Sequence, residues 1–126
     1  MPTLLTLRDA DAYIVVVVTQ TPLGEFEVLV LMAVLHLGDA AYPPAVRAAI
    51  ESRTGRRVSR GAVYVTLDRL EAKRLLASRL APPGGDDAGR PRRFYRVAPR
   101  GLRAVREALR SVERMREGLD RLLETS

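Results

Sequence analysis

Residues 59–74, SRGAVYVTLDRLEAKR, combine small, hydroxyl-bearing and basic side chains at a spacing suited to reading a nucleic acid. We expect a helix here, because apolar residues recur every three to four positions. With Leu67 facing the core, the inner side would carry Val63, Leu67, Leu70 and Arg74. The outer side would carry Gly61, Val65, Asp68 and Ala72, with Tyr64 and Arg69 on the flanks.

The outer face of this helix is small and neutral, which suits insertion into a major groove. A valine there can meet a thymine methyl group, and a tyrosine can hydrogen-bond phosphate or base. The first residues, at the positive end of the helix dipole, suit backbone phosphates. The predicted contacts are Ser59, Arg60, Gly61, Tyr64, Val65 and Arg69. The alternative is that Tyr64 packs sideways onto the first helix and that Val65 is an ordinary exposed apolar residue.

A second basic segment, GRPRRFYRV at 89–97, follows a stretch rich in Pro, Gly and Asp. Alternation places Tyr95 and Val97 on one face of a strand, and Phe94 and Arg96 on the other. A hairpin of this kind can lay arginines along phosphates or in a minor groove. Its predicted contacts are Arg90, Arg92 and Arg93.

The charge distribution supports a polyanionic partner. The 126 residues hold 21 Lys plus Arg against 15 Asp plus Glu, a formal net charge of +6. The excess is uneven, because residues 1–40 are acidic whereas residues 90–106 contain seven basic residues and no acid. Two basic segments on one small domain indicate nucleic-acid binding, although a solvated basic surface is the simpler alternative.

The residue inventory argues against an enzyme. The chain has no Cys, no Trp and one histidine, His36, so thiol catalysis and cysteine or multi-histidine metal sites are excluded. No cluster of titratable side chains emerges from the spacing. We therefore expect neither catalysis nor a cofactor or metal.

The N-terminal segment, residues 1–20, contains the β-branched run YIVVVV at 13–18. This run is far shorter than the roughly 20 residues of a membrane span, and it lacks the flanks of a signal peptide. We expect a cytoplasmic protein with no membrane partner. Residues 1–20 are either an arm that pairs with this chain or a partner, or a leader.

Three helices are expected to form the body of the domain. A first helix would start at Thr21 and Pro22 and run to Leu37, apolar on nearly every side, so that a partner subunit would cover what the core does not. A second would run from Pro43 to about Arg53 and close at Gly55. The helix at 59–74, with Ser59 as its N-cap, would be the third.

Two short strands, 76–81 and 92–97, would follow, separated by a tip at 82–91. The order helix, helix, helix, strand, strand is that of a winged helix-turn-helix. The predicted fold is therefore mainly α with a small β-hairpin, an α+β arrangement whose DNA-binding domain spans residues 21–98.

A long final helix is expected from about Pro99 to Leu123, within a dimerisation segment at 99–126. Apolar residues repeat there at alternating intervals of three and four, interrupted by Arg116. Such a helix would be about 40 Å long, more than a compact domain covers, which favours a homodimer. The predicted dimer contacts are Leu102, Val105, Leu109, Val112, Met115, Leu119 and Leu122. The alternative is a helix folded entirely onto its own domain. Arg116 would either fix the register or pair with Glu113, Glu117 or Asp120.

Taken together, three stretches between residues 22 and 120 resemble the PadR family of bacterial transcriptional regulators, in its short-tailed branch with one C-terminal helix. These stretches are LGEFEVLVLMAVL, SRGAVYVTLDRLEAKRLL and GRPRRFYRVAPRGLRAV. The resemblance implies a homodimeric winged-helix repressor that binds double-stranded DNA at a palindromic operator. It also implies a small aromatic or drug-like effector at the dimer interface.

The chain departs from the family pattern at several positions. Arg74 stands where the family usually has Gly, so the end of that helix would need another closure. Ala98 stands where Thr is usual, which removes a cap oxygen. No Trp is present to stack a flat ligand, and residues 1–20 have no family counterpart. Two other functions stay open: an RNA-binding winged helix, and a protein-interaction module without operator specificity.

Overall fold

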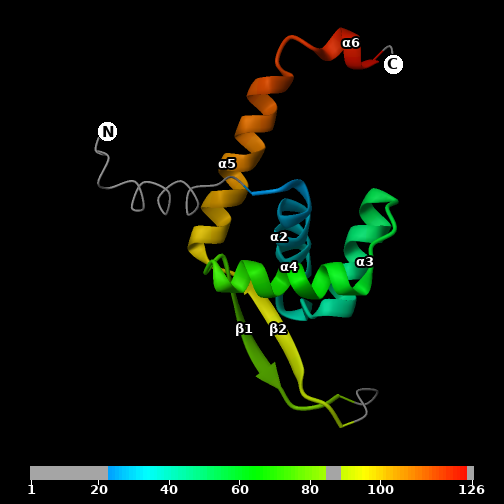
Figure 1. The fold of residues 1–126 in the computed structure, drawn as a ribbon, viewed down its shortest axis with the longest axis vertical. Coiled ribbons are helices and arrows are strands. Elements are labelled where there is room, and N and C mark those ends of the chain that lie inside the picture. The colour runs from blue at the N-terminus through cyan, green and yellow to red at the C-terminus, as the bar shows by residue number, and fades with distance from the viewer. Residues whose placement is uncertain (1–22, 85–88, 125–126) are drawn as a thin grey trace, which may run out of the picture.

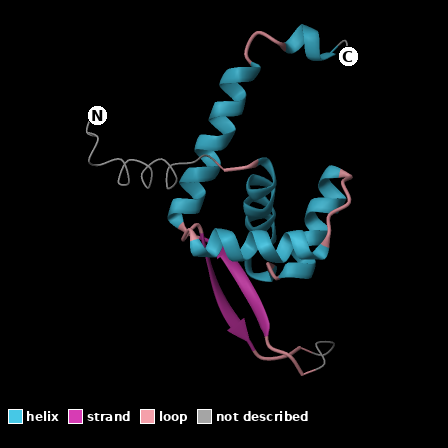
Figure 2. Cartoon of the chain, in the orientation of Figure 1, coloured by secondary structure: helices cyan, strands magenta, loops and turns pink. Residues whose placement is uncertain are grey.

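The structure is a computed structural model that describes residues 23–84 and 89–124. Its helices and strands bear out the predicted mainly helical fold with a two-stranded hairpin (Figures 1 and 2). The elements are α2 (Glu25–Leu37), η3 (Gly38–Ala40), α3 (Pro43–Thr54), α4 (Arg60–Ala72), β1 (Leu76–Ala81), β2 (Arg92–Val97), α5 (Pro99–Arg116) and α6 (Asp120–Glu124). The expectations for residues 1–20 and for the centre of the hairpin tip lie outside the described residues.

Helix α2 begins at Glu25, so its predicted start at Thr21 and Pro22 is wrong. Gly24 is the N-cap, and its backbone N–H donates to the Glu27 carboxylate at 2.9 Å. A glutamate three residues into a helix satisfies an otherwise unpaired N–H in this way. Val30, Leu31 and Val34 of α2 are fully buried and form the centre of the core.

Helix α3 packs beside α2 and ends as expected. Its buried residues include Val46 and Ile50, and Gly55 closes it at φ +74°. A left-handed residue after a helix is most easily a glycine, because a Cβ would clash there. The short connection through Gly55 leads directly to the start of α4.

Helix α4 begins at its predicted cap, where the Ser59 hydroxyl accepts a hydrogen bond from the Ala62 N–H at 3.0 Å. The predicted core residues Val63, Leu67 and Leu70 are buried, and so is Thr66, which the sequence analysis did not place there. The helix ends at Ala72, so the prediction that Arg74 shares its core side is wrong.

The end of α4 closes without a glycine. Arg74 itself takes the left-handed conformation, with φ +64°, and the Leu75 N–H donates to the Leu70 carbonyl at 2.9 Å. This is the closure that glycine normally provides. The expectation of a different closure is therefore wrong: the backbone keeps the same turn, and Arg74 carries the strain.

Strands β1 and β2 have the predicted bounds and pair antiparallel, from Leu76 opposite Val97 to Ala81 opposite Arg92. Tyr95 is buried, and its N–H donates to the Ala41 carbonyl at 2.8 Å. Phe94 stacks on Tyr42 with ring centroids 5.5 Å apart. These contacts hold the base of the hairpin against the loop before α3, as a two-stranded sheet requires.

Helix α5 leaves the body beside α2 and extends away from the hairpin (Figure 1). It starts at Pro99, and its N-cap residue, Ala98, provides no side-chain cap, as expected. Gly101 lies against the Leu75 carbonyl, so closely that a Cβ would stand 2.2 Å from that oxygen. Val105, only 5% exposed, joins the domain's own core, which contradicts its place in the predicted dimer seam.

The final helix is not continuous to Leu123. Helix α5 ends at Arg116, Gly118 adopts φ +86°, and α6 follows as a separate turn. The uninterrupted part is therefore about 27 Å long. Arg116 pairs with Glu113 within α5 and with Asp120 across this break, which are two of the three predicted local partners.

Candidate nucleic-acid interface

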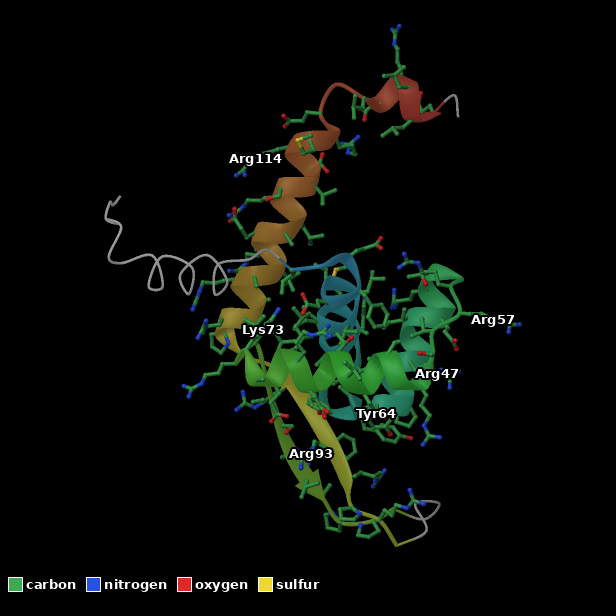
Figure 3. The ribbon with its side chains drawn as sticks, viewed as in Figure 1. Arg47, Arg57, Tyr64, Lys73, Arg93 and Arg114 are labelled. Atoms are coloured by element: carbon green, nitrogen blue, oxygen red, sulfur yellow. The ribbon has the colours of Figure 1, made fainter. Side chains whose placement is uncertain are left out.

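The first two turns of α4 present a small, open surface. Nothing lies within 4 Å of a Cβ placed on Gly61, and Val65 is 55% exposed. Tyr64 is 40% exposed beside them, with the Arg60 guanidinium 5.9 Å from its ring centre. Tyr64 lies on the side of α4 that faces the hairpin in Figure 3. The predicted contacts from Ser59 to Val65 thus share one exposed face.

Arg57 extends this surface beyond the residues that the sequence analysis named. It is exposed and projects from the connection before Ser59 (Figure 3). The same connection is fixed by Arg47, whose Nε donates to the Val58 carbonyl at 2.8 Å, and by Glu51, which accepts from the Val58 N–H at 2.9 Å. Arg57 itself could have been found from its place two residues before the cap.

Arg69 lies apart from the other predicted contacts on α4. Its guanidinium approaches the Glu27 carboxylate at 4.0 Å, and Lys73 reaches the same carboxylate at 3.0 Å. Burial raises the pKa of Glu27, but the Gly24 N–H, Lys73 and Arg69 outweigh it and hold the pKa below its usual value. Arg69 therefore ties α4 to the start of α2.

The three predicted wing arginines differ in their surroundings. Arg90 is exposed at the edge of the tip. Arg92 is partly buried, and its guanidinium lies 5.3 Å from the ring centre of Phe94 and 6.0 Å from that of Tyr42. Arg93 donates from Nη1 to the Ser78 hydroxyl at 2.8 Å. Among the described residues, no such contact is made by Arg90.

A polar group that the sequence analysis missed lies between the hairpin and α4. The Ser78 hydroxyl donates to Glu71 at 2.6 Å, and the buried Tyr95 stands opposite Ser78 in the register. Burial raises the pKa of Tyr95, and the nearby carboxylates of Asp68 and Glu71 raise it further. Ser78 carries no motif, so only the strand register reveals its place.

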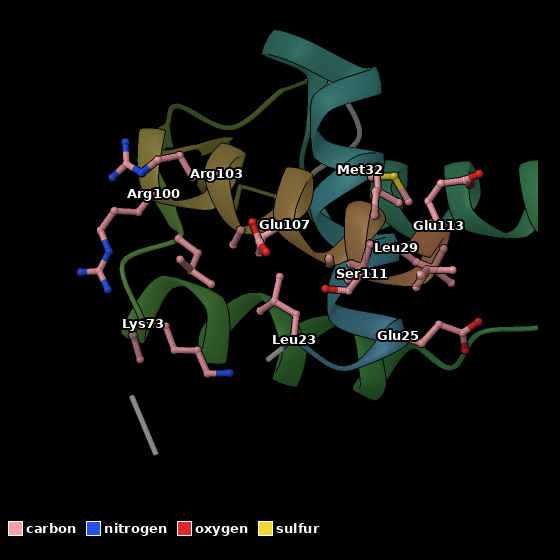
Figure 4. A pocket seen from close by; sticks show the side chains of 17 residues that line it. Leu23, Glu25, Leu29, Met32, Lys73, Arg100, Arg103, Glu107, Ser111 and Glu113 are labelled. Atoms are coloured by element: carbon pink, nitrogen blue, oxygen red, sulfur yellow. The ribbon is translucent and has the colours of Figure 1, made fainter. Parts of the chain in front are cut away.

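A groove of about 1370 Å³ runs between α2, the end of α4 and α5 (Figure 4). Apolar residues of α2, among them Leu29 and Met32, form one side, and Ala108 and Val112 of α5 form the other. Charged residues such as Lys73 and Arg103 line its edges. This groove lies beside the predicted dimer seam, away from the exposed face of α4.

Within residues 23–84 and 89–124, no group of His, Asp and Glu could hold a metal ion. None of the helices in these same ranges is long and apolar enough to cross a membrane.

Three helices followed by a hairpin, with an open face on the third helix beside a basic wing, define the winged helix-turn-helix class of nucleic-acid-binding proteins. The model of the transcriptional regulator PadR-like family matches residues 31–107. The chain belongs to this family.

Individual relatives agree with this assignment. Transcriptional regulator Rv3488 of Mycobacterium tuberculosis is 45% identical over 64 residues, which are 51% of this chain and 56% of that protein. The match thus spans little more than half of that relative. A PadR family transcriptional regulator from Eggerthella lenta is 27% identical, with 94% of this chain and 96% of that one covered and a TM-score of 0.60.

A PadR-like transcriptional regulator from Bacillus cereus shows the same fold. It is 21% identical, with 76% of this chain and 91% of that one covered and a TM-score of 0.59.

Proposed function

We propose that this protein is a transcriptional repressor that binds a palindromic DNA operator as a homodimer. The observation that carries the proposal is the open face at the start of α4, where Gly61 and Val65 are uncovered beside the exposed Tyr64. A helix inserted into a major groove needs small residues where its backbone approaches the bases.

The surroundings of this face have the charge that a phosphate backbone requires. Arg57 and Arg60 flank the N-terminus of α4, and Arg90 lies at the edge of the wing. Contacts of this kind fix the register of the protein on the duplex, whereas the side chains on the helix read the bases. Since the target is chromosomal DNA, we place the protein in the cytoplasm.

The apolar side of α5 supports a homodimer. Beyond Val105 it is uncovered: Leu109, Val112 and Met115 are exposed, the last two by 66% and 78%. Large apolar side chains exposed in one row mark an interaction surface. Leu102, Leu119 and Leu122 are exposed as well and can contribute to the same interface.

The groove beside α5 is suited to a helix of the second subunit. Its volume of about 1370 Å³ exceeds the range of roughly 300–1,000 Å³ that is usual for small-molecule sites. A small aromatic effector would lie in the part that the second subunit leaves open, although the residues lining the groove include no aromatic side chain.

Footprinting on the intergenic DNA beside the gene, followed by titrations at several salt concentrations, tests operator binding. If a dimer neutralises about eight phosphates, log K should fall with log salt at a slope of about −7. Protection of an inverted repeat with half-sites about one DNA turn apart is expected. A slope near zero with every promoter fragment would contradict the proposal.

Two competitions separate this function from the alternatives. Structured RNA should displace the protein from the operator far less well than duplex DNA does; a preference for RNA would favour the RNA-binding alternative. A protein-interaction module would keep its partner when Arg90, Arg92 and Arg93 are all replaced by Ala, whereas operator binding should be lost.

A further inference from the structure

A short chain of hydrogen bonds joins the wing to α4. Arg93 on β2 donates from Nη1 to the Ser78 hydroxyl on β1 at 2.8 Å, and that hydroxyl donates to the Glu71 carboxylate on α4 at 2.6 Å. The three side chains come from three different elements. We refer to Glu71, Ser78 and Arg93 as the wing relay.

The strand register shows in which direction Arg93 points. Arg93 stands opposite Leu80, whereas Ser78 stands opposite Tyr95. To reach Ser78, the Arg93 side chain must lean two positions along the ladder toward the base of the hairpin, away from the tip at 82–91. Its guanidinium is therefore directed at the C-terminal half of α4.

The surroundings of the relay favour a fixed arrangement. Glu71 and Ser78 are half-buried, Arg93 is exposed, and the buried Tyr95 lies on the same face of the hairpin. Hydrogen bonds with an ionised partner are short and directional, and the half-buried bond from Ser78 to Glu71 gives the exposed Arg93 a fixed partner. On the other side, the Tyr95 N–H fixes β2 to Ala41.

We infer that Arg93 is a positioning residue that, through Ser78 and Glu71, sets the angle of the wing relative to the recognition helix, rather than a phosphate contact. This inference rests on the proposed operator binding and replaces the predicted direct contact of Arg93. The helix and the wing must enter neighbouring grooves at a fixed spacing. A loosened wing has to be ordered on binding, which weakens the specific complex.

Comparison of Arg93→Ala with Arg90→Ala in salt titrations tests the inference. Arg90 is an exposed wing arginine that the relay does not include, so its loss should reduce the salt slope by about 0.9 per subunit. Arg93→Ala should lower operator affinity by about 5- to 10-fold with an unchanged slope. Affinity for non-specific duplex DNA should fall much less.

A second test uses Ser78, the uncharged member of the wing relay. Ser78→Ala removes no charge, yet it should cause about the same loss of operator affinity as Arg93→Ala. The double variant should lose little more than either single one, because both changes break the same chain. Retained helical circular dichroism and urea midpoints would show that the variants fold.

Two results would overturn the inference: a salt slope that falls with Arg93→Ala as it does with Arg90→Ala, or full operator affinity of Ser78→Ala. Failure of the proposed function looks different, since the wild-type protein would then bind no duplex at all. In that case, amide hydrogen exchange of the protein without DNA still tests whether the wing relay holds the hairpin. Faster exchange of β1 and β2 in Ser78→Ala is expected, and unchanged exchange would count against the relay.

Discussion

At the scale of single residues, Val65 is an apolar side chain that the fold leaves uncovered. It is more than half exposed on the outer face of α4. Exposed valines are common, so exposure alone does not assign a role. A contact with a thymine methyl group would explain why a valine stands beside Gly61 and Tyr64.

Val65→Ala tests this contact when it is combined with an altered operator. Replacing thymine by deoxyuridine at one position removes a single methyl group, which should weaken wild-type binding by about 1 kcal/mol if Val65 covers it. Val65→Ala should be insensitive to the same replacement. Competition titrations with the two operators measure the difference, and equal sensitivity of both proteins would show that the exposure of Val65 is incidental.

Among residues 23–84 and 89–124, Arg74 is the residue other than glycine that has a positive φ. Its φ of +64° places a Cβ in the left-handed region, which costs about 1 kcal/mol for a residue other than glycine. Arg74→Gly should therefore raise the free energy of unfolding by about 1 kcal/mol. Urea titration should show a higher midpoint with an unchanged slope.

Arg74→Ala is the matched control for this change. It removes the charge and keeps the Cβ, so it should leave the unfolding midpoint almost where it is. If alanine stabilised the protein as much as glycine, the gain would come from the lost charge and the strain argument would be wrong.

At the scale of elements, Glu27 connects the start of α2 with the end of α4. It accepts from the Gly24 N–H and pairs with Lys73 and Arg69. Glu27→Gln should lower the free energy of unfolding at pH 7 by about 1–2 kcal/mol, because the cap and both ion pairs weaken. Urea titration measures this loss.

The pH dependence of the same variant follows from the lowered pKa of Glu27. A carboxylate whose pKa is lower in the folded state stabilises the protein above its unfolded-state pKa, and this contribution disappears as the pH falls through the folded-state value. The gap between wild type and Glu27→Gln should therefore narrow below about pH 5. A gap that stays constant down to pH 3 would contradict this account.

The close approach of α5 to the connection between α4 and β1 depends on Gly101. A Cβ there would meet the Leu75 carbonyl, which also accepts from the Ala98 N–H. Since backbone cannot move aside cheaply, Gly101→Ala should lower the free energy of unfolding by about 2–3 kcal/mol. Thermal or urea unfolding measures it.

Gly61→Ala makes the contrasting control. Gly61 also lies in a helix, but nothing stands near its Cβ position, so alanine should stabilise α4 by up to about 1 kcal/mol. The same change should weaken operator binding, because it adds a methyl group to the approaching face. Equal effects of the two substitutions on stability would argue against the close approach at Gly101.

At the scale of the whole molecule, the exposed apolar row of α5, Leu109, Val112 and Met115, is the proposed interface with a second subunit. Leu109→Asp places a charge in this row and should dissociate the dimer, since a buried unpaired carboxylate is strongly unfavourable. Operator affinity should then fall by a factor of about 10² or more through lost bivalency. Light scattering gives the mass directly.

Arg114→Glu is the matched control on the opposite side of α5. By helical geometry Arg114 points away from Leu109, and it is exposed, so its charge reversal should leave the dimer intact. A dimer that survives Leu109→Asp would count against this interface.

The sequence alone predicted the elements that local chemistry specifies. The two strands have the predicted bounds because alternating residues and a Pro- and Gly-rich tip mark both ends. Ser59 caps α4 because a serine oxygen satisfies a free N–H wherever the chain turns into a helix. The order of these elements was enough to indicate a winged helix.

Only the tertiary structure decided which partner each of several chemically similar residues contacts. The sequence does not distinguish Arg69, Arg90, Arg92 and Arg93. In the structure, Arg69 lies near Glu27, Arg92 lies over aromatic rings and Arg93 donates to Ser78. Likewise, the heptad pattern runs through Val105 and across Gly118, whereas the fold buries the first and ends the helix before the second. The spacing of apolar residues indicates which side of a helix is apolar. It does not indicate what covers that side, because the covering residues come from distant parts of the chain.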